Sequence, residues 1–414
     1  MFCSQRQSIC PPHGTALRGQ AGRLNSFAQH EQGVLPSQML ALLAKEGVLH
    51  KGDEEILEAD IQPASIDLHL GDVAYSLRSG FLPSRVSVAE KLARFQIDRI
   101  DLGGEGAILE RYRPYLIPLL EYVDLPPHLR GKANPKSSTG RLDILTRVIT
   151  DRSFMYDEVP PGYHGRLYLE LVSSTFPIQV KKGLALNQLR ISAGRPQLND
   201  ENIQEILKDT PLLFENGHPS NRTQVANGLF LSLDLGRRGG DRVGFRAKDD
   251  SPPIDLSKFE HYKPITHWET VSSERGGILV LHPGKFYLLL SKESVRIPPE
   301  YAAEMTAYDP TSGELRTHYA GFFDPGFGFG PSGQSQGSKA ALEVRAHDVP
   351  FAVEHGQNIC RLTFEHMLEP PKKLYSTVIG SHYQKQESAL SKHFIRQRPV
   401  DSVDDEPPKP ETLF

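Results

Sequence analysis

The chain has 414 residues, with 47 Lys and Arg against 51 Asp and Glu, for a formal net charge of −4. This length exceeds one ordinary domain, and the slight acidity excludes nucleic-acid binding driven by overall charge. No apolar run approaches the roughly 20 residues that span a bilayer, and the three cysteines form no disulfide framework. We therefore expect a cytoplasmic protein with no nucleic-acid partner and no membrane partner.

The first predicted elements follow a polar N-terminal extension. Residues 1–33 are rich in Gln, Ser, Gly and Arg, which predicts disorder. Residues 37–49 then show helical spacing of apolar side chains, with Ser37 as the expected N-cap. The segment ASIDLHLGDVAYSL (64–77) alternates in polarity and predicts a strand. We therefore expect ordered structure to begin near residue 34.

The remaining elements are predicted as short strands separated by Pro and Gly, of which the chain holds 32 and 35. The clearest strands lie at 166–173 and within 176–192, followed by a short helix at 198–208. A second strand-rich stretch begins near residue 225, and 396–414 are again predicted to be disordered. This pattern predicts a mainly β protein with a few short helices.

The two strand-rich stretches repeat at one spacing. The segment that begins at Leu125 resembles the segment at Ile297, 172 residues later. Three further pairs are 173 residues apart: Gly140 and Gly313, Glu170 and Glu343, and Gly183 and Gly356. Strand-turn-strand patterns also look alike by chance, but offsets that agree within one residue across four landmarks indicate an internal repeat. We predict two related antiparallel barrel or sandwich domains, residues 34–205 and 206–395, between extensions 1–33 and 396–414.

The segment KANPKSSTGRLDI (132–144) concentrates cations and hydroxyls. Lys136, Ser137, Ser138 and Arg141 offer charge-assisted donors, and an arginine suits bidentate contact with phosphate. The alternative is an ordinary solvated turn. The segment is not a P-loop, because the GxxxxGK[ST] pattern is absent. It predicts an anion site only if other residues complete it.

Carboxylates in apolar surroundings are the candidate acid/base groups. Glu170 and Glu343 each lie centrally in a short apolar strand, where a partly desolvated carboxylate can act as general acid and base. The alternative is an exposed strand face. Asp324 precedes a Pro-Gly turn and either opens that turn or faces a ligand. His267 and Glu269 match half of a zinc deaminase motif, which we interpret as coincidence because its cysteine pair is missing.

Five segments match one family in a single order. They are IQPASIDLHLG (61–71), KSSTGRL (136–142), AGFFDPGFG (320–328), ALE (341–343) and HYQKQ (382–386). Together they resemble the dCTP deaminase branch of the deoxyuridine triphosphatase (dUTPase) superfamily, in a longer form with two fused family-type domains. The resemblance spans roughly residues 35–395 and implies two tandem dUTPase-like distorted antiparallel β-barrels.

The resemblance implies hydrolytic deamination of dCTP to dUTP and ammonia. It implies no metal in catalysis, with Mg²⁺ bound together with the substrate triphosphate, and a homo-oligomer, since family sites form between subunits. The family's catalytic residues match Glu343 or equally Glu170, together with Arg141, Ser137 and Ala320. Its substrate-binding residues match Lys136, Ser138, Asp324, Ala341, Leu342, Tyr375, His382 and Gln386.

Neither repeat carries a complete set of these residues. In repeat 2, Pro310 stands opposite Ser137 and Glu314 opposite Arg141, and a carboxylate there would repel phosphate. In repeat 1, Pro160 stands where repeat 2 has Asp324. We therefore predict one composite site per chain, with the phosphate motif from repeat 1 and the base pocket, glutamate and C-terminal lid from repeat 2.

Two other functions stay open on the sequence. A dUTPase, or a bifunctional enzyme that deaminates and then releases pyrophosphate, would use a carboxylate such as Asp324 to activate water toward phosphate. A nucleotide-binding regulator without catalysis would account for the loss of half of each site. Random decay, however, would not preserve one full set across the two repeats.

Overall fold

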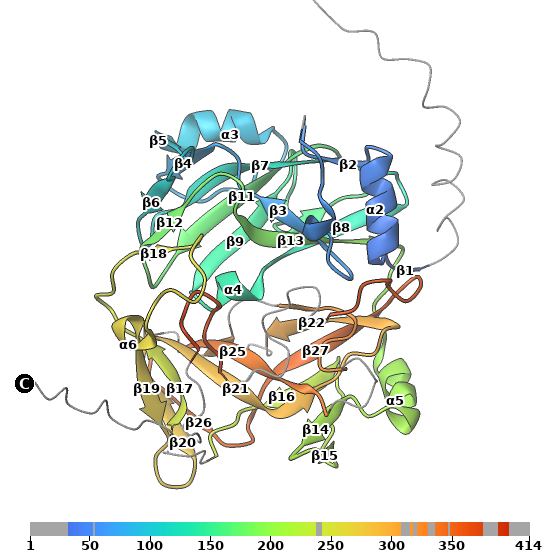
Figure 1. Cartoon of the computed structure of the whole chain (residues 1–414), viewed down its shortest axis with the longest axis vertical. Coiled ribbons are helices and arrows are strands. Elements are labelled where there is room, and N and C mark those ends of the chain that lie inside the picture. The colour runs from blue at the N-terminus through green and yellow to red at the C-terminus, as the bar shows by residue number, and fades with distance from the viewer. Residues whose placement is uncertain are drawn as a thin grey trace, which may run out of the picture.

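In the computed structural model of the chain, residues 32–52, 54–236, 242–307, 315–317, 321–329, 336–346, 348–375 and 388–396 are described. They form two β-rich lobes that lie against each other, the first blue to green and the second light green to red in Figure 1. The predicted mainly β fold with a few short helices is confirmed.

The first lobe combines a five-stranded and a six-stranded antiparallel sheet. Its strands are β1 (Gly33–Val34), β2 (Leu49–His50), β3 (Ile66–His69), β4 (Val73–Leu77), β5 (Gln96–Asp101), β6 (Ala107–Leu109), β7 (Tyr115–Asp124), β8 (Leu129–Pro135), β9 (Ile144–Ile149), β10 (Glu158–Val159), β11 (His164–Ser173), β12 (Ile178–Val180) and β13 (Ala185–Ala193). Its helices are α2 (Ser37–Lys45), η1 (Glu58–Asp60), α3 (Val88–Phe95) and α4 (Ser137–Gly140). Apolar residues from both sheets share one core.

The second lobe is built on a seven-stranded and a four-stranded sheet. Its strands are β14 (Leu213–Glu215), β15 (His218–Pro219), β16 (Leu229–Ser232), β17 (Arg242–Ala247), β18 (Ile254–Asp255), β19 (Trp268–Ser272), β20 (Ile278–Leu281), β21 (Phe286–Val295), β22 (Tyr301–Ala307), β23 (Leu315–Thr317), β24 (Phe322–Phe323), β25 (Ser338–Ala346), β26 (Phe351–Glu354) and β27 (Asn358–His366). Its helices are α5 (Asp200–Asp209) and α6 (Pro264–His267). Ile203 of α5, which crosses the predicted boundary at residue 205, packs in the core of this lobe.

The alternation of β25 places the candidate glutamate at the junction of the lobes. Ala340, Leu342 and Val344 are buried in the core of the second lobe. Successive side chains of a strand point to opposite faces, so Glu343 and Arg345 point the other way, toward the first lobe, where α4 lies (Figure 1). The period-two pattern of the sequence therefore fixes the direction of Glu343.

Two predicted elements differ from the structure in detail. Ser37 is the first residue of α2 rather than its N-cap, because Pro36 has the extended backbone of the N-cap position. Residues 64–77 form the two strands β3 and β4 instead of one. Gly71 ends the first of them, since its N–H donates to the carbonyl of Pro118 at 2.9 Å. A Cβ on Gly71 would lie 2.4 Å from that oxygen, so only glycine fits this turn.

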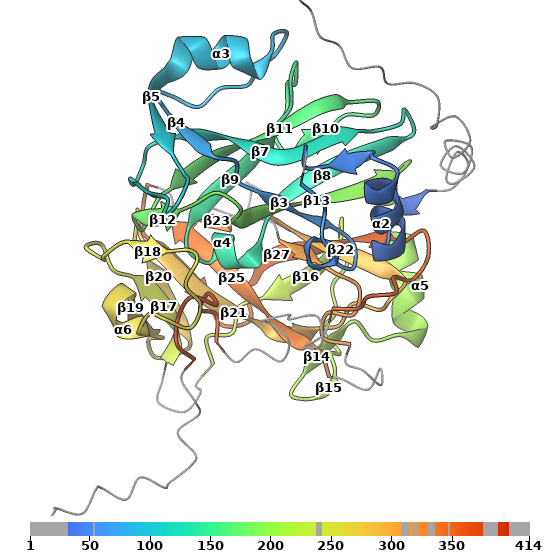
Figure 2. The ribbon, with the colours of Figure 1, turned by 45° about the horizontal axis from the view of Figure 1, so that its top comes forward.

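The lobes are joined by apolar packing and by ion pairs. Trp268 and Phe286 of the second lobe belong to the core cluster of the first, and β18 pairs in parallel with β12. Ion pairs that cross the junction include Lys132–Glu304, Arg190–Glu365 and Arg345–Asp143. Figure 2 shows the same close contact from a second direction, with α4 between the lobes. Sites at this junction are therefore held by both lobes.

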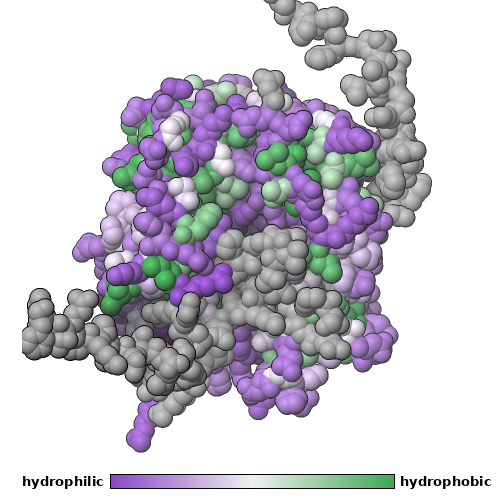
Figure 3. Space-filling view, viewed as in Figure 1, coloured by the Kyte–Doolittle hydropathy of each residue, from purple (hydrophilic) through white to green (hydrophobic). Residues whose placement is uncertain are grey.

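The described part of the face seen in Figure 3 is mostly polar. In Figure 3 hydrophilic residues dominate the described part of the visible face, and apolar residues are scattered among them. Among the residues that the structure describes, no helix is long and apolar enough to cross a membrane.

Candidate active site

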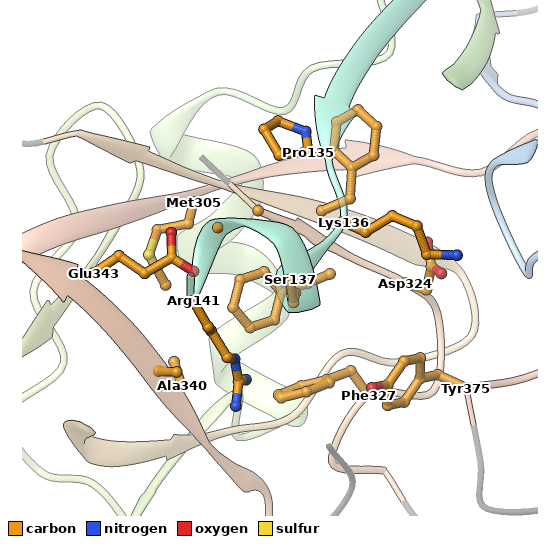
Figure 4. Close-up of a pocket in the computed structure, with 15 residues that line it drawn as sticks. Pro135, Lys136, Ser137, Arg141, Met305, Asp324, Phe327, Ala340, Glu343 and Tyr375 are labelled. Atoms are coloured by element: carbon orange, nitrogen blue, oxygen red, sulfur yellow. The ribbon is translucent and has the colours of Figure 1, made fainter. Parts of the chain in front are cut away.

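One pocket opens at the junction of the lobes, and both lobes line it (Figure 4). The first lobe contributes the end of β8 and helix α4, through Pro135, Lys136, Ser137, Gly140 and Arg141. The second lobe contributes Met305, Gly321, Phe322, Phe323, Asp324, Phe327, Ala340, Ala341, Glu343 and Tyr375. The predicted phosphate motif of one repeat and the glutamate and turn of the other therefore meet within a single chain.

Glu343 points at the last turn of α4. The residue is 8% exposed, and its Oε2 is buried without a hydrogen-bond partner among the described residues. Its carboxyl group lies against Gly140, where a Cβ would come within 2.5 Å of Oε2 and 2.7 Å of Oε1. Burial raises the pKa of Glu343 well above its ordinary value, opposed by the charge of Arg141 and reinforced by that of Asp143. Such a carboxyl group is suited to hold and deliver a proton.

Arg141 links α4 to the C-terminal segment of the chain. Its side chain is buried, and Nη1 donates to the carbonyls of Ala389 and Leu390 at 3.3 and 3.4 Å. In the same segment, Ser391 Oγ donates to the carbonyl of Ser138 at 2.8 Å. The position of this arginine beside Glu343 therefore depends on contacts with the C-terminal segment, which lies roughly 250 residues later in the sequence.

Phe394 anchors that C-terminal segment. It is 1% exposed, and its ring packs at 5.4 Å from His267 and 6.0 Å from Trp268, centroid to centroid. Burial and the positive charge of Lys136 together lower the pKa of the neighbouring Lys392 to about 8. The segment thus brings another cation close to the predicted phosphate motif.

Asp324 lies at the other end of the pocket, near Lys136 (Figure 4). The carboxylate is 8% exposed, and burial raises its pKa. The guanidinium of Arg190, at 3.5 Å from Asp324 Oδ1, opposes that rise. Lys136 in turn forms an ion pair with Asp67, a residue of the 61–71 motif. The pocket therefore has a buried carboxyl group at each end.

Some predicted residues lie outside this pocket. Glu170 is 2% exposed, pairs with Arg147 and lies 3.5 Å from the hydroxyl of Tyr156. Ser138 is buried behind the lining. Leu342 is turned into the core of the second lobe, because it alternates with Glu343 along β25. Ala320, His382 and Gln386 lie outside the described residues.

Sequence reasoning missed three residues that shape the site. Gly140 marked the repeat and lay within the 136–142 motif without an assigned role, yet its missing side chain makes room for Glu343. Asp67 was part of a motif but had no assigned role, and it pairs with Lys136. Arg190 lies within the largely apolar β13 and was not singled out. A charge inside an apolar strand is the signal that identified Glu343, and applied to β13 it would have found Arg190.

The zinc-like triplet has a structural role. His267 is fully buried, its Nε2 lies 3.1 Å from the carbonyl of Pro252, and burial lowers its pKa. Its ring packs against Phe176 and Phe394. Over the described ranges, no group of three His, Cys, Asp or Glu side chains is placed to hold a metal ion. Glu269 is exposed and pairs with Arg246, so the two motif residues do not form a common site.

The family comparison covers both repeats. Residues 31–195 match the N-terminal domain of 2′-deoxycytidine 5′-triphosphate deaminase, and residues 199–394 match its C-terminal domain. The crystal structure of 2′-deoxycytidine 5′-triphosphate deaminase from Agrobacterium tumefaciens is 42% identical with a TM-score of 0.76, over 81% of this chain and 99% of that chain.

Shorter relatives match about half of the chain. The dCTP deaminase of Natronomonas pharaonis is 34% identical over 195 residues, 46% of this chain and 90% of the relative. The dUMP-forming dCTP deaminase of Methanosphaera stadtmanae is 26% identical over 182 residues, 43% of this chain and 83% of the relative. With both family domains matched in order and the fold shared at 42% identity, the chain belongs to the 2′-deoxycytidine 5′-triphosphate deaminase family.

Proposed function

We propose that this chain deaminates dCTP by hydrolysis at C4 of the cytosine ring, which yields dUTP and ammonia. The observation that carries the proposal is the composite pocket, in which Glu343 of the second lobe lies against Gly140 and beside Arg141 of the first. Family membership and the names of the relatives support dCTP as the substrate.

Glu343 is proposed as the proton shuttle. Its raised pKa means that it holds a proton more strongly than an ordinary glutamate does. It donates this proton to N3 of the ring, and the resulting carboxylate takes a proton from water as the water oxygen bonds to C4. That proton passes to the amine, the C4–N bond breaks and ammonia leaves. The carboxylate finally recovers the hydroxyl proton as the C4 carbonyl forms. Positioned acid/base catalysis of this kind contributes about 10²–10⁴-fold.

The other pocket residues are proposed to bind and orient. Arg141 and Ser137 steady the glutamate and the charge that develops near the ring. Asp324 accepts a hydrogen bond from the deoxyribose 3′-hydroxyl. Lys136, Tyr375, His382 and Gln386 are proposed to bind the triphosphate, which arrives with Mg²⁺, and no cofactor takes part in the chemistry. The carbonyl of Ala320 is proposed to orient the water or the amine, with Ala341 beside the base.

The product distinguishes two versions of this reaction. Several relatives are named dUMP-forming dCTP deaminases, with 26–34% identity. Purified protein should be incubated with dCTP and Mg²⁺ while ammonia, dUTP, dUMP and pyrophosphate are followed together. We expect ammonia with dUTP. Ammonia with dUMP and pyrophosphate would replace the proposal by the bifunctional reaction, and binding of dCTP without turnover would replace it by the regulatory one.

Substitution of each glutamate in turn tests whether the active site is the composite pocket around Glu343 or lies around Glu170. Glu343→Ala should abolish ammonia release, whereas Glu170→Ala should retain most of it, since Glu170 pairs with Arg147 away from the pocket. Circular dichroism of both variants controls for folding. The reverse pattern of activities would move the site to the first repeat.

We also propose that the chain self-associates, because the resemblance implies family sites at subunit contacts. Light scattering coupled to gel filtration measures this directly, and a monomeric mass at micromolar concentration would refute it.

A further inference from the structure

Arg190 of β13 reaches across the junction from the first lobe to the second. The residue is 2% exposed. Its Nη1 donates to Glu365 Oε2 at 2.6 Å and to the carbonyl of Ala303 at 3.3 Å. Its guanidinium carbon lies 3.9 Å from the centroid of the Phe322 ring, and Nη2 lies 3.5 Å from Asp324 Oδ1. Since Phe322 and Asp324 both line the pocket, Arg190 supports that wall from behind.

The contact between Arg190 and Asp324 is incomplete. At 3.5 Å the two groups attract each other but are too far apart for a good hydrogen bond. Asp324 Oδ1 and Arg190 Nε and Nη2 are buried, with no hydrogen-bond partner among the described residues. A buried carboxylate oxygen that keeps an open lone pair is costly, and a ligand donor would satisfy it. The pocket therefore offers Asp324 Oδ1 as a hydrogen-bond acceptor. The positive charge of Arg190 balances its charge, and no donor occupies it among the described residues.

The charges around Asp324 come from several elements. Burial raises its pKa, and the negative charge of Asp67 on β3 raises it further. Arg190 is the largest opposing influence, and Lys136 before α4 adds to it. Behind Arg190, Glu365 of β27 competes for the same guanidinium. Without Arg190, this carboxyl group would hold its proton over a wider pH range.

The second repeat does not duplicate this arginine. Residue 363, which lies 173 positions after Arg190, is a threonine. Its Oγ1 lies 3.3 Å from the carbonyl of Glu304, within its own lobe. The arrangement of Arg190 is thus specific to the one wall that carries Asp324.

We propose that Arg190 is a positioning residue, which keeps Asp324 ionised and oriented to accept a hydrogen bond from the 3′-hydroxyl of the nucleotide. Through Asp324 it sets the preference of the pocket for substrates that carry this hydroxyl. The inference rests on the proposed function for the identity of the substrate. A neutral carboxyl group is a weaker acceptor, so loss of the guanidinium should weaken binding of the sugar more than the chemistry at the base.

The test compares dCTP with 2′,3′-dideoxycytidine triphosphate, which lacks the 3′-hydroxyl. For Arg190→Met we expect KM for dCTP to rise about 10- to 100-fold, the range of a hydrogen bond to a charged group, with a smaller change in kcat. The parameters for the dideoxy substrate should change little, so the preference between the two collapses. KM of the variant for dCTP should fall as pH rises, because Asp324 then ionises. Arg190→Lys should retain part of the preference, since it keeps the charge.

Glu365→Gln is the matched control. It removes the other carboxylate that Arg190 contacts and leaves the guanidinium beside Asp324. We expect it to keep the preference for dCTP. Equal losses for both substrates in Arg190→Met, without pH dependence, or the same collapse in Glu365→Gln, would show that Arg190 only holds the lobes together and would overturn the proposal.

Measurements of nucleotide binding test the role of Arg190 independently of whether the protein deaminates dCTP. Calorimetry with both nucleotides is done in the Glu343→Gln background, with and without Arg190→Met. If the preference for dCTP over the dideoxy nucleotide is lost with Arg190→Met, the proposal is supported even if the native protein shows no turnover. Equal binding of the two nucleotides before Arg190 is changed overturns it, whether or not dCTP is deaminated.

Discussion

Substitution of Gly140 by alanine tests whether Glu343 acts at the geometry seen here. Gly140 ends α4, and its φ is not in the left-handed region, so the backbone accepts an alanine. A Cβ at this position would lie 2.5 Å from Glu343 Oε2 and 2.9 Å from Cδ. Ordinary contact begins near 3.4 Å, so the carboxylate must retreat by about 0.9 Å. It can do so cheaply because it is the end of a flexible side chain.

The expected result is a loss of activity without a loss of stability. A displacement of about 1 Å at a reacting group costs about 10²-fold in rate, so kcat for ammonia release should fall by that factor. Replacing glycine by alanine in a helix stabilises by about 0.5–1 kcal/mol, so the midpoint of urea unfolding should stay or rise. Steady-state kinetics and urea titration measure the two effects separately.

Gly80→Ala is the matched control, because a Cβ there would lie 2.5 Å from Oε2 of Glu170. This variant makes the same collision with the glutamate of the other repeat and should keep full activity. Full activity in Gly140→Ala, or an equal loss in both variants, would refute the assignment of Glu343 as the proton shuttle.

Three further predictions concern charge and anchoring. Glu343→Gln should raise the melting temperature at pH 8 and leave it equal to that of the native protein near pH 4. The reason is that a carboxyl group with a raised pKa loses its stabilising contribution as pH rises. The same difference in melting temperature at both pH values would contradict this. Arg345→Met should cost about 3–5 kcal/mol in urea unfolding, because it takes the guanidinium from Asp143, whose side chain is 1% exposed; a loss below 1 kcal/mol would show that the pair contributes little. Phe394→Ala should lower kcat and expose residues 388–396 to limited proteolysis, because it removes the anchor of the segment that holds Arg141, and unchanged protease resistance would place the anchor elsewhere.

Local patterns explain why much of the fold was predictable. Alternation along 166–173 marks β11, and helical spacing at 198–208 marks α5 within two residues of its ends. The same alternation placed Glu343 on the face of β25 that points away from the core. Where prediction erred, a contact between distant residues had intervened: Gly71 ends β3 because it meets Pro118, and Gly33, assigned to the disordered extension, pairs with Ala193 in β1. Such pairings have no local signature.

The sequence by itself determined that the chain contains two related β-rich repeats, and it predicted that they hold complementary halves of one set of residues. Spacing within each repeat carries that information, because every motif is continuous along the chain. Only the tertiary structure decided that α4 meets β25, that Gly140 leaves space for Glu343, and that Arg190 supports Asp324 across the junction. These contacts join residues more than 130 positions apart. They arise from the way the two lobes pack against each other, which the pattern of side chains along a single strand does not predict.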